Sequence, residues 1–184
     1  MKGIIFNLAQ EVITQSHGED AWDALLDSAG LDGSYTSLGN YPDGDLDALV
    51  GAAATAMNQP ASQIVRELGV GAMPLLAARY PSFFAGHAFT EPFLLTLNEI
   101  IHAEVRKLYS DADLPTFGFE SHDGALVMRY DSKRKLCALA EGFIIGAATR
   151  FGERAVITQT TCMNRGDARC LLNCVFSPAD VGSN

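Results

Sequence analysis

His102 is the residue whose surroundings most suggest metal chemistry. It lies in the segment 90–109, whose apolar residues recur at helical spacing: Phe93, Leu94, Leu97, Ile101, Val105 and Leu108. His102 sits at the edge of this apolar stripe, one turn after Asn98. A neutral imidazole is a common metal ligand, but a single histidine at such a place is more often part of the core. Taken alone, His102 is therefore only a candidate.

A second group of polar side chains follows at Tyr130, Ser132 and Arg134. On an extended segment these alternate residues project to the same side. A guanidinium binds a carboxylate through two hydrogen bonds, and the two hydroxyls can donate others. The trio suits a ligand with paired carboxylates, although an ordinary strand end with a solvated arginine gives the same pattern.

All four cysteines lie in the last third of the chain, at Cys137, Cys162, Cys170 and Cys174. In a reducing compartment such a cluster indicates metal or redox chemistry more than structural disulfides. Tetrahedral zinc needs its thiolates about 2.3 Å from one ion. On one straight strand, residues 170 and 174 would be about 13 Å apart, so they share a metal only if the chain bends between them. Scattered buried thiols in apolar strands are the alternative.

The elements that must position these side chains fall into two regions. Residues 1–109 are predicted to be mostly helical, with helices around 4–13, from Glu19, over 43–57, from Pro60 as a first helical residue, and over 90–109. Residues 113–176 alternate between strand and helix. Strands are predicted over 115–120, 125–132, 155–162 and 168–176, with a helix over 135–150 and a hairpin turn at 122–124.

Helices first and strands later predict an α+β fold. We expect an N-terminal helical subdomain and a C-terminal subdomain with a small antiparallel sheet and helices. The length of 184 residues suits one domain, so residues 1–184 are expected to form a single unit.

Composition narrows the class of partner. The formal net charge is −9, and an acidic chain repels phosphate backbones, so nucleic acid is not an expected partner. No apolar run approaches the roughly 20 residues that a membrane helix needs, so no membrane is expected either. The first eight residues lack the pattern of a signal peptide, which favours a cytoplasmic protein.

In order along the chain, His102, Pro115 and the Tyr-x-Ser-x-Arg motif at 130–134 resemble the haem nitric oxide/oxygen binding (H-NOX) family, relatives of the sensor domain of soluble guanylate cyclase. The motif alone is a weak pattern, but the ordered set is specific. The resemblance runs from Met1 to Phe176. It includes the segments Met-Lys-Gly-Ile-Ile-Phe at 1–6, His-Gly-Glu-Asp-Ala-Trp at 17–22 and Tyr-Pro-Ser-Phe-Phe-Ala-Gly at 80–86.

The resemblance implies a haem b cofactor between the two subdomains, with His102 as the proximal iron ligand. Pro115 and Ile5 would press on the porphyrin, although by themselves they are an ordinary strand-start proline and an ordinary core residue. The propionates would be held by Tyr130, Ser132 and Arg134.

The resemblance also indicates which gas binds. O₂-binding members carry a distal tyrosine nine residues after the tyrosine of the motif, and that position is Leu139 here. Two supporting polar positions correspond to Ala9 and Ala72. A donor to bound O₂ contributes about 1.5–3 kcal/mol, whereas NO on ferrous iron needs far less help. The apolar residues therefore imply NO and CO as ligands and the exclusion of O₂.

The implied activity is sensing and not catalysis. NO would bind the iron opposite His102, weaken or break the iron–histidine bond and let the helices move. The signal would then pass to a separate enzyme, a histidine kinase or a cyclic-di-GMP enzyme. A subset of NO-sensing members carries a cysteine set similar to the four cysteines here, which binds zinc and responds to oxidation.

Two alternatives compete with a haem sensor. A peroxidase needs a distal acid or base, which Ala9, Ala72 and Leu139 do not supply. A thiol/zinc redox sensor, in which the cysteine cluster carries the signal, stays open. The intact haem motifs argue against loss of haem function, and the two mechanisms can coexist.

Overall fold

Helices make up the N-terminal part of the chain. The computed structural model describes residues 1–109, 111–122 and 124–179. Its helices are Gly3–His17 (α1), Glu19–Ala29 (α2), Asp43–Met57 (α3), Ala61–Arg79 (α4), Pro81–Phe84 (α5), Thr90–Leu95 (α6), His102–Leu108 (α7) and Cys137–Arg150 (α8). A π-helical turn, η1 (Leu97–Ile101), joins α6 to α7, and a 3₁₀ turn, η2 (Met163–Arg165), precedes the last strand.

The C-terminal part carries one antiparallel sheet. Its strands are β1 (Thr116–His122), β2 (Ala125–Asp131), β3 (Glu153–Thr161) and β4 (Cys170–Pro178), in the order β1-β2-β4-β3. The predicted strands and the α+β class are confirmed, with ends that shift by a residue or two. At the β1–β2 turn, Gly124 has a φ of +78°, as a tight hairpin requires. The middle residue of the predicted turn, Asp123, lies outside the described residues.

Two expected helix boundaries are wrong. Pro60 is the residue before α4 and not its first helical residue, because its ψ of 139° is extended. The single helix expected over 90–109 is broken into α6, η1 and α7. The hydroxyl of Thr96 donates to the carbonyl of Phe93 at 2.7 Å, and the N–H of Ile101 reaches back five residues to the carbonyl of Thr96 at 3.1 Å. The i→i−5 hydrogen bond widens the turn, which helical periodicity cannot reveal.

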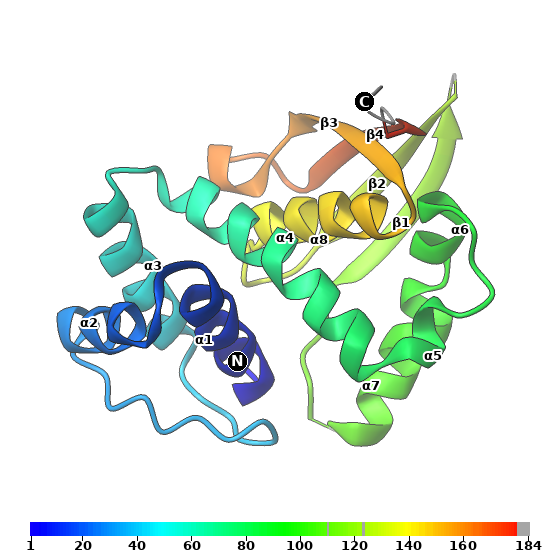
Figure 1. Ribbon diagram of the computed structural model, residues 1–184. Helices are drawn as coiled ribbons and strands as arrows, with labels where there is room; N and C mark the ends of the chain where they lie inside the picture. The colour runs from blue at the N-terminus through cyan, green and yellow to red at the C-terminus, as the bar shows by residue number, and fades with distance from the viewer. Residues whose placement is uncertain (110, 123, 180–184) are drawn as a thin grey trace, which may run out of the picture.

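The apolar side chains form two cores on either side of α4. The smaller core joins α1, α2 and α3, which gather around the N-terminus on one side of the molecule (Figure 1). The larger core fills the space between the sheet, α8 and the segment from α5 to α6. Met73 of α4 belongs to the larger core, while Leu68 of the same helix packs against the smaller one. Helix α4 therefore ties the two parts together.

Helix α8 lies between α4 and the inner face of the sheet (Figure 1). Residues on all its sides are buried, from Cys137 in its first turn to Ala148 near its end. A helix that is apolar all round belongs in the interior. Its buried carboxylate, Glu141, is paired with Arg66 of α4, whose Nε lies 2.8 Å from Oε2.

Glycines let α4 and α8 approach closely. A Cβ atom on Gly142 would lie 2.0 Å from the carbonyl oxygen of Arg66, and one on Gly69 would lie 2.6 Å from that of Leu139. These neighbours are backbone atoms that cannot move aside. Only a residue without a Cβ fits at these positions, so the spacing of the two helices is fixed by sequence.

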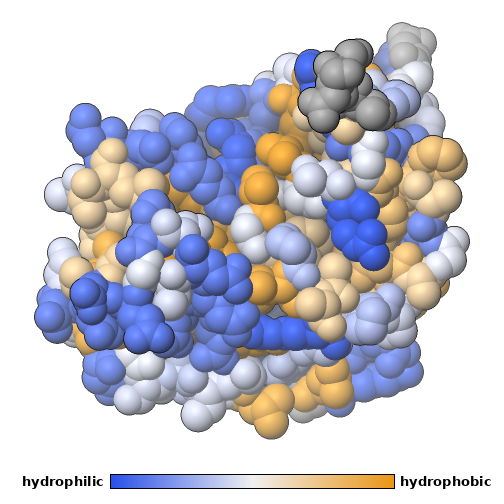
Figure 2. Space-filling model, in the orientation of Figure 1, coloured by the Kyte–Doolittle hydropathy of each residue, from blue (hydrophilic) through white to orange (hydrophobic). Residues whose placement is uncertain are grey.

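The outer surface carries both polar and apolar side chains. In the space-filling view, hydrophilic side chains cover most of α1 and α2, while apolar side chains are interspersed with polar ones on the side of α5–α7 (Figure 2). Over the three described ranges, no helix is both long enough and apolar enough to cross a membrane.

Replacing Gly142 with alanine is expected to lower the free energy of unfolding by about 3 kcal/mol, because the new methyl group meets backbone on α4. Gly51→Ala is the matched control, since Gly51 lies in α3 with nothing within 4 Å of an added Cβ. That change should leave stability unchanged or raise it by up to about 1 kcal/mol. Urea unfolding of both variants checks this, and equal losses would contradict the close packing of α4 on α8.

Candidate haem pocket and thiol cluster

A cavity of about 310 Å³ opens between α1, α8, the inner ends of β1 and β2, and the rod formed by α6, η1 and α7. Most of its wall is apolar. All seven side chains that the sequence assigned to a cofactor line it: Ile5, His102, Pro115, Tyr130, Ser132, Arg134 and Leu139. The structure thus gathers residues from positions 5 to 139 around one space.

His102 forms part of the cavity wall at the first position of α7. Its side chain is buried, and its Nδ1 atom has no hydrogen-bond partner among the described residues. The imidazole ring packs against Phe117, with ring centroids 5.5 Å apart. Burial, with a smaller contribution from the charge of Arg106, lowers the pKa of His102 to about 4. The imidazole is therefore neutral at pH 7, which is the form that binds metal.

The π turn shifts the side chains that follow it around the helix axis. In a regular helix, the residue about two turns after Leu94 would be Ile101. The wide turn adds one residue, so His102 also reaches the cavity wall, beside Ile101. The exposed fractions agree, because His102 and Tyr109 are 9% and 7% exposed whereas Leu108 is 57% exposed. Leu108, which helical periodicity places on the apolar face, borders the cavity but is mostly exposed.

Tyr130, Ser132 and Arg134 meet at the cavity, but not along one extended strand. Strand β2 ends at Asp131, and a turn closed by a 3.1 Å hydrogen bond from the Lys135 N–H to the Ser132 carbonyl follows. The Tyr130 hydroxyl accepts the N–H of Leu136 at 3.0 Å. Burial raises the pKa of Tyr130 despite its hydrogen bond with Ser132, so the phenol stays protonated. The turn replaces the predicted strand and still brings the three side chains together.

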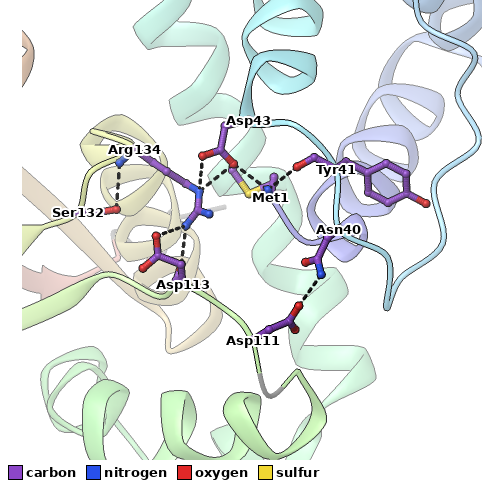
Figure 3. Close-up of polar contacts among 8 residues, drawn as sticks. All are labelled: Met1, Asn40, Tyr41, Asp43, Asp111, Asp113, Ser132 and Arg134. Atoms are coloured by element: carbon purple, nitrogen blue, oxygen red, sulfur yellow. Dashed lines mark hydrogen bonds and ion pairs between the residues drawn. The ribbon is translucent and has the colours of Figure 1, made fainter.

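Arg134 holds two carboxylates at the cavity mouth (Figure 3). Its Nε lies 3.0 and 2.9 Å from the two carboxylate oxygens of Asp43, and its Nη1 lies 3.2 Å from Oδ2 of Asp113. The N-terminal ammonium of Met1 also contacts Asp43, at 2.7 Å. Burial raises the pKa of Asp43, but hydrogen bonds from the ammonium and from Arg134 outweigh it, so the net pKa lies below the usual value. The guanidinium is therefore a carboxylate site in this fold.

Sequence reasoning missed these acidic partners. Asp43 is 91 residues from Arg134, and in the sequence it is an ordinary acidic residue in the first turn of a helix. A second contact beside it joins Lys2 and Asn40 to Asp111 (Figure 3 shows the Asn40 contact). Only the tertiary fold brings these segments together, so local patterns carry no signal for them.

The distal positions separate into two groups. Leu139, in the first turn of α8, lines the cavity and is buried. Ala9 and Ala72 are also buried, but neither lines this cavity. Leu139 thus stands where a side chain can reach a bound ligand, and its hydrocarbon offers no hydrogen-bond donor.

Three of the four cysteines form a compact group. The sulfur atoms of Cys137, Cys162 and Cys170 all lie within 4.8 Å of one another, and the first two are 3.7 Å apart. Cys174 is not in this group. It lies on the same straight strand as Cys170, and its thiol contacts the carbonyl of Leu172. Strand β4 is continuous over both residues, so the wide separation that the sequence predicts for Cys170 and Cys174 holds in the structure.

Hydrogen-bond donors and burial shift the pKa values of the sulfurs in this group in opposite directions. The Met163 N–H of the 3₁₀ turn donates to the Cys170 sulfur at 3.3 Å, and the Asn164 amide donates to the Cys137 sulfur at 3.6 Å. Burial raises the pKa of Cys170 to about 12, and repulsion from the neighbouring sulfurs adds to the shift. For Cys162, burial raises the pKa but hydrogen bonds, with the Asn164 N–H first, bring it below the usual value.

Comparisons with known proteins give a matching family model and similar solved structures. A family model described as Haem-NO-binding matches residues 2–159. A mutant H-NOX protein from S. oneidensis in the Fe(II) state is 30% identical over all of both chains, with a TM-score of 0.90. The S. oneidensis protein in the Fe(II)NO state is 31% identical over 96% of this chain and 99% of that chain, with a TM-score of 0.89. An unliganded Fe(II) H-NOX protein from K. algicida, 24% identical over both full chains with a TM-score of 0.86, shares the fold. No curated protein matches the chain.

Proposed function

This chain belongs to the haem-NO-binding (H-NOX) family, and from that membership we propose that it is a haem-based sensor of nitric oxide with His102 as its one protein ligand to iron. The strongest support for this proposal is the environment of the His102 side chain. A buried neutral imidazole on the wall of an apolar cavity is a ready iron ligand, and a guanidinium that binds carboxylates stands at the mouth. These features suit haem b, which is apolar in the middle and anionic at one edge.

The other residues of the cavity wall would hold the haem. Arg134, Tyr130 and Ser132 would bind the propionates, with Arg134 exchanging one carboxylate partner for another. Pro115, just before β1, and Ile5 of α1 would press on the porphyrin. A bound haem would supply an iron that takes NO or CO on the side opposite His102, and NO there would weaken or break the bond to the imidazole.

The choice of gas rests on Leu139. Bound O₂ gains about 1.5–3 kcal/mol from a hydrogen-bond donor, whereas NO needs little such help. Because Leu139 lines the cavity and supplies no donor, we expect the protein to bind NO and CO and to exclude O₂. Leu139 also supplies no distal acid or base, which favours a sensor over a peroxidase.

The signal would reach a partner through the rod of α6, η1 and α7, which carries His102. Leu95, Ile100 and Leu108 lie on α6, η1 and α7, and each is about half exposed. These apolar side chains offer a docking face whose position follows His102. We propose that the partner is a separate histidine kinase or cyclic-di-GMP enzyme in the cytoplasm.

Leu139→Tyr should create O₂ binding, because a phenol at this position can donate to the ligand. The gain in O₂ affinity should be roughly 10- to 150-fold. The ferrous wild type should change its visible spectrum with NO and with CO but not in air. Leu139→Phe is the matched control, since it adds the ring without the hydroxyl. An oxygenated spectrum of the wild type in air would contradict the gas selectivity, and no response to NO would contradict the sensor itself.

We further propose that Cys137, Cys162 and Cys170 hold a zinc ion. Thiolates placed tetrahedrally at about 2.3 Å from zinc are about 3.8 Å from one another. The 3.7 Å separation of the Cys137 and Cys162 sulfurs is close to this value. The same short distance supports the second candidate function, a redox sensor in which an oxidant joins two of these sulfurs and releases the metal.

Zinc content distinguishes the three grouped cysteines from Cys174. Freshly purified wild type and Cys174→Ala should each carry about one zinc per chain, while Cys162→Ala should lose most of it. Both changes remove a buried thiol, so their effects on the core are comparable. Metal analysis after desalting measures the content. Metal-free wild type, or equal losses in the two variants, would refute the three-thiol site.

A further inference from the structure

Asn98 connects the π turn to the open edge of the sheet. Its side-chain Nδ2 donates to the Phe117 carbonyl at 2.6 Å, and the Phe117 N–H donates to its Oδ1 at 3.2 Å. Strand β1 is an edge strand of the sheet, so one side of its backbone lacks a neighbouring strand. On that side, the Asn98 carboxamide forms hydrogen bonds with both the N–H and the carbonyl of Phe117, as the peptide unit of a neighbouring strand would.

The same two residues stand next to the proposed iron ligand. Asn98 lies within η1, and the N–H of His102 donates back to the carbonyl of Leu97 to close the wide turn. Phe117 packs its ring against the imidazole of His102. One side chain therefore fixes both the turn that brings His102 inward and the strand that carries the ring against it.

The wide turn needs such an attachment. A π turn is rare because regular α-helical hydrogen bonding competes with it, and it persists where other contacts hold it. If η1 relaxed into regular α-helix, the residues after it would rotate about the helix axis, and the His102 imidazole would turn away from its present direction. Two hydrogen bonds to the strand backbone oppose that change, since they fix Asn98 relative to Phe117.

We propose that Asn98 is a positioning residue, whose carboxamide holds the π turn and so sets the orientation of the His102 imidazole toward the iron. This role rests on the proposed haem function. Asn98 itself does not line the cavity. It acts through the backbone of the turn and through Phe117, and it therefore tunes the iron–histidine bond without touching the haem.

The test uses the full chain loaded with haem and two variants of Asn98. Asn98→Ala removes both hydrogen bonds, while Asn98→Asp keeps an acceptor for the Phe117 N–H but loses the donor to its carbonyl. Glu99→Ala is the matched control, because Glu99 is an exposed residue of the same turn. Resonance Raman spectra of the reduced, unliganded protein report the iron–histidine stretch directly.

We expect the iron–histidine band to shift and broaden in Asn98→Ala, to change less in Asn98→Asp, and to match the wild type in Glu99→Ala. Haem content should stay at the wild-type level in all three. In the haem-free protein, exchange of the Phe117 amide should quicken roughly tenfold in Asn98→Ala, as loss of its hydrogen bond allows.

An unchanged band in both Asn98 variants would overturn the positioning role. If Asn98→Ala does not fold, Asn98→Asp decides the matter alone, by a shift of the same band. A wild type without any iron–histidine band would instead refute the proposed function, and the amide exchange would still show whether Asn98 holds the strand.

Discussion

The contact between α4 and α8 is the constraint on which the rest of the structure depends. Backbone meets backbone there, because Gly69 and Gly142 leave no room for a Cβ atom. Helix α4 belongs to both cores, and α8 rests on the sheet. The cavity keeps its size because these two helices cannot move apart or slide together without losing that fit. The first turn of α8 then carries Leu139 to the cavity and Cys137 to the thiol cluster.

The first turn of α8 therefore links the proposed haem pocket with the thiol cluster. Cys137 and Leu139 are two residues apart, so a change at the sulfur cluster and a change at the pocket act on the same turn of helix. On the other wall, His102 depends on a wide turn that one carboxamide attaches to β1. The pocket is thus bounded by a rigid helix pair on one side and by a less regular rod on the other. A sensor needs this combination, because the rod can respond only if the rest stays in place.

Sequence patterns identified the members of the pocket but not its geometry. His102, Pro115 and the Tyr-x-Ser-x-Arg motif were recognisable because their types and order are specific. The inward placement of His102 was not, since it depends on the tertiary contact between Asn98 and Phe117. The carboxylates around Arg134 were missed for the same reason, as they come from distant segments (Figure 3). Strand geometry did anticipate that Cys170 and Cys174 would stand apart.

The visible spectrum of the reduced protein, recorded without a ligand and then with NO, tests the central claim most directly. The account predicts five-coordinate iron bound to one histidine before the gas is added, and five-coordinate iron without histidine afterwards. The second state follows because NO should release His102 from the opposite side. Failure to take up haem, or a reduced protein whose spectrum is indifferent to NO, would contradict the assignment of His102 as the bond that senses the gas.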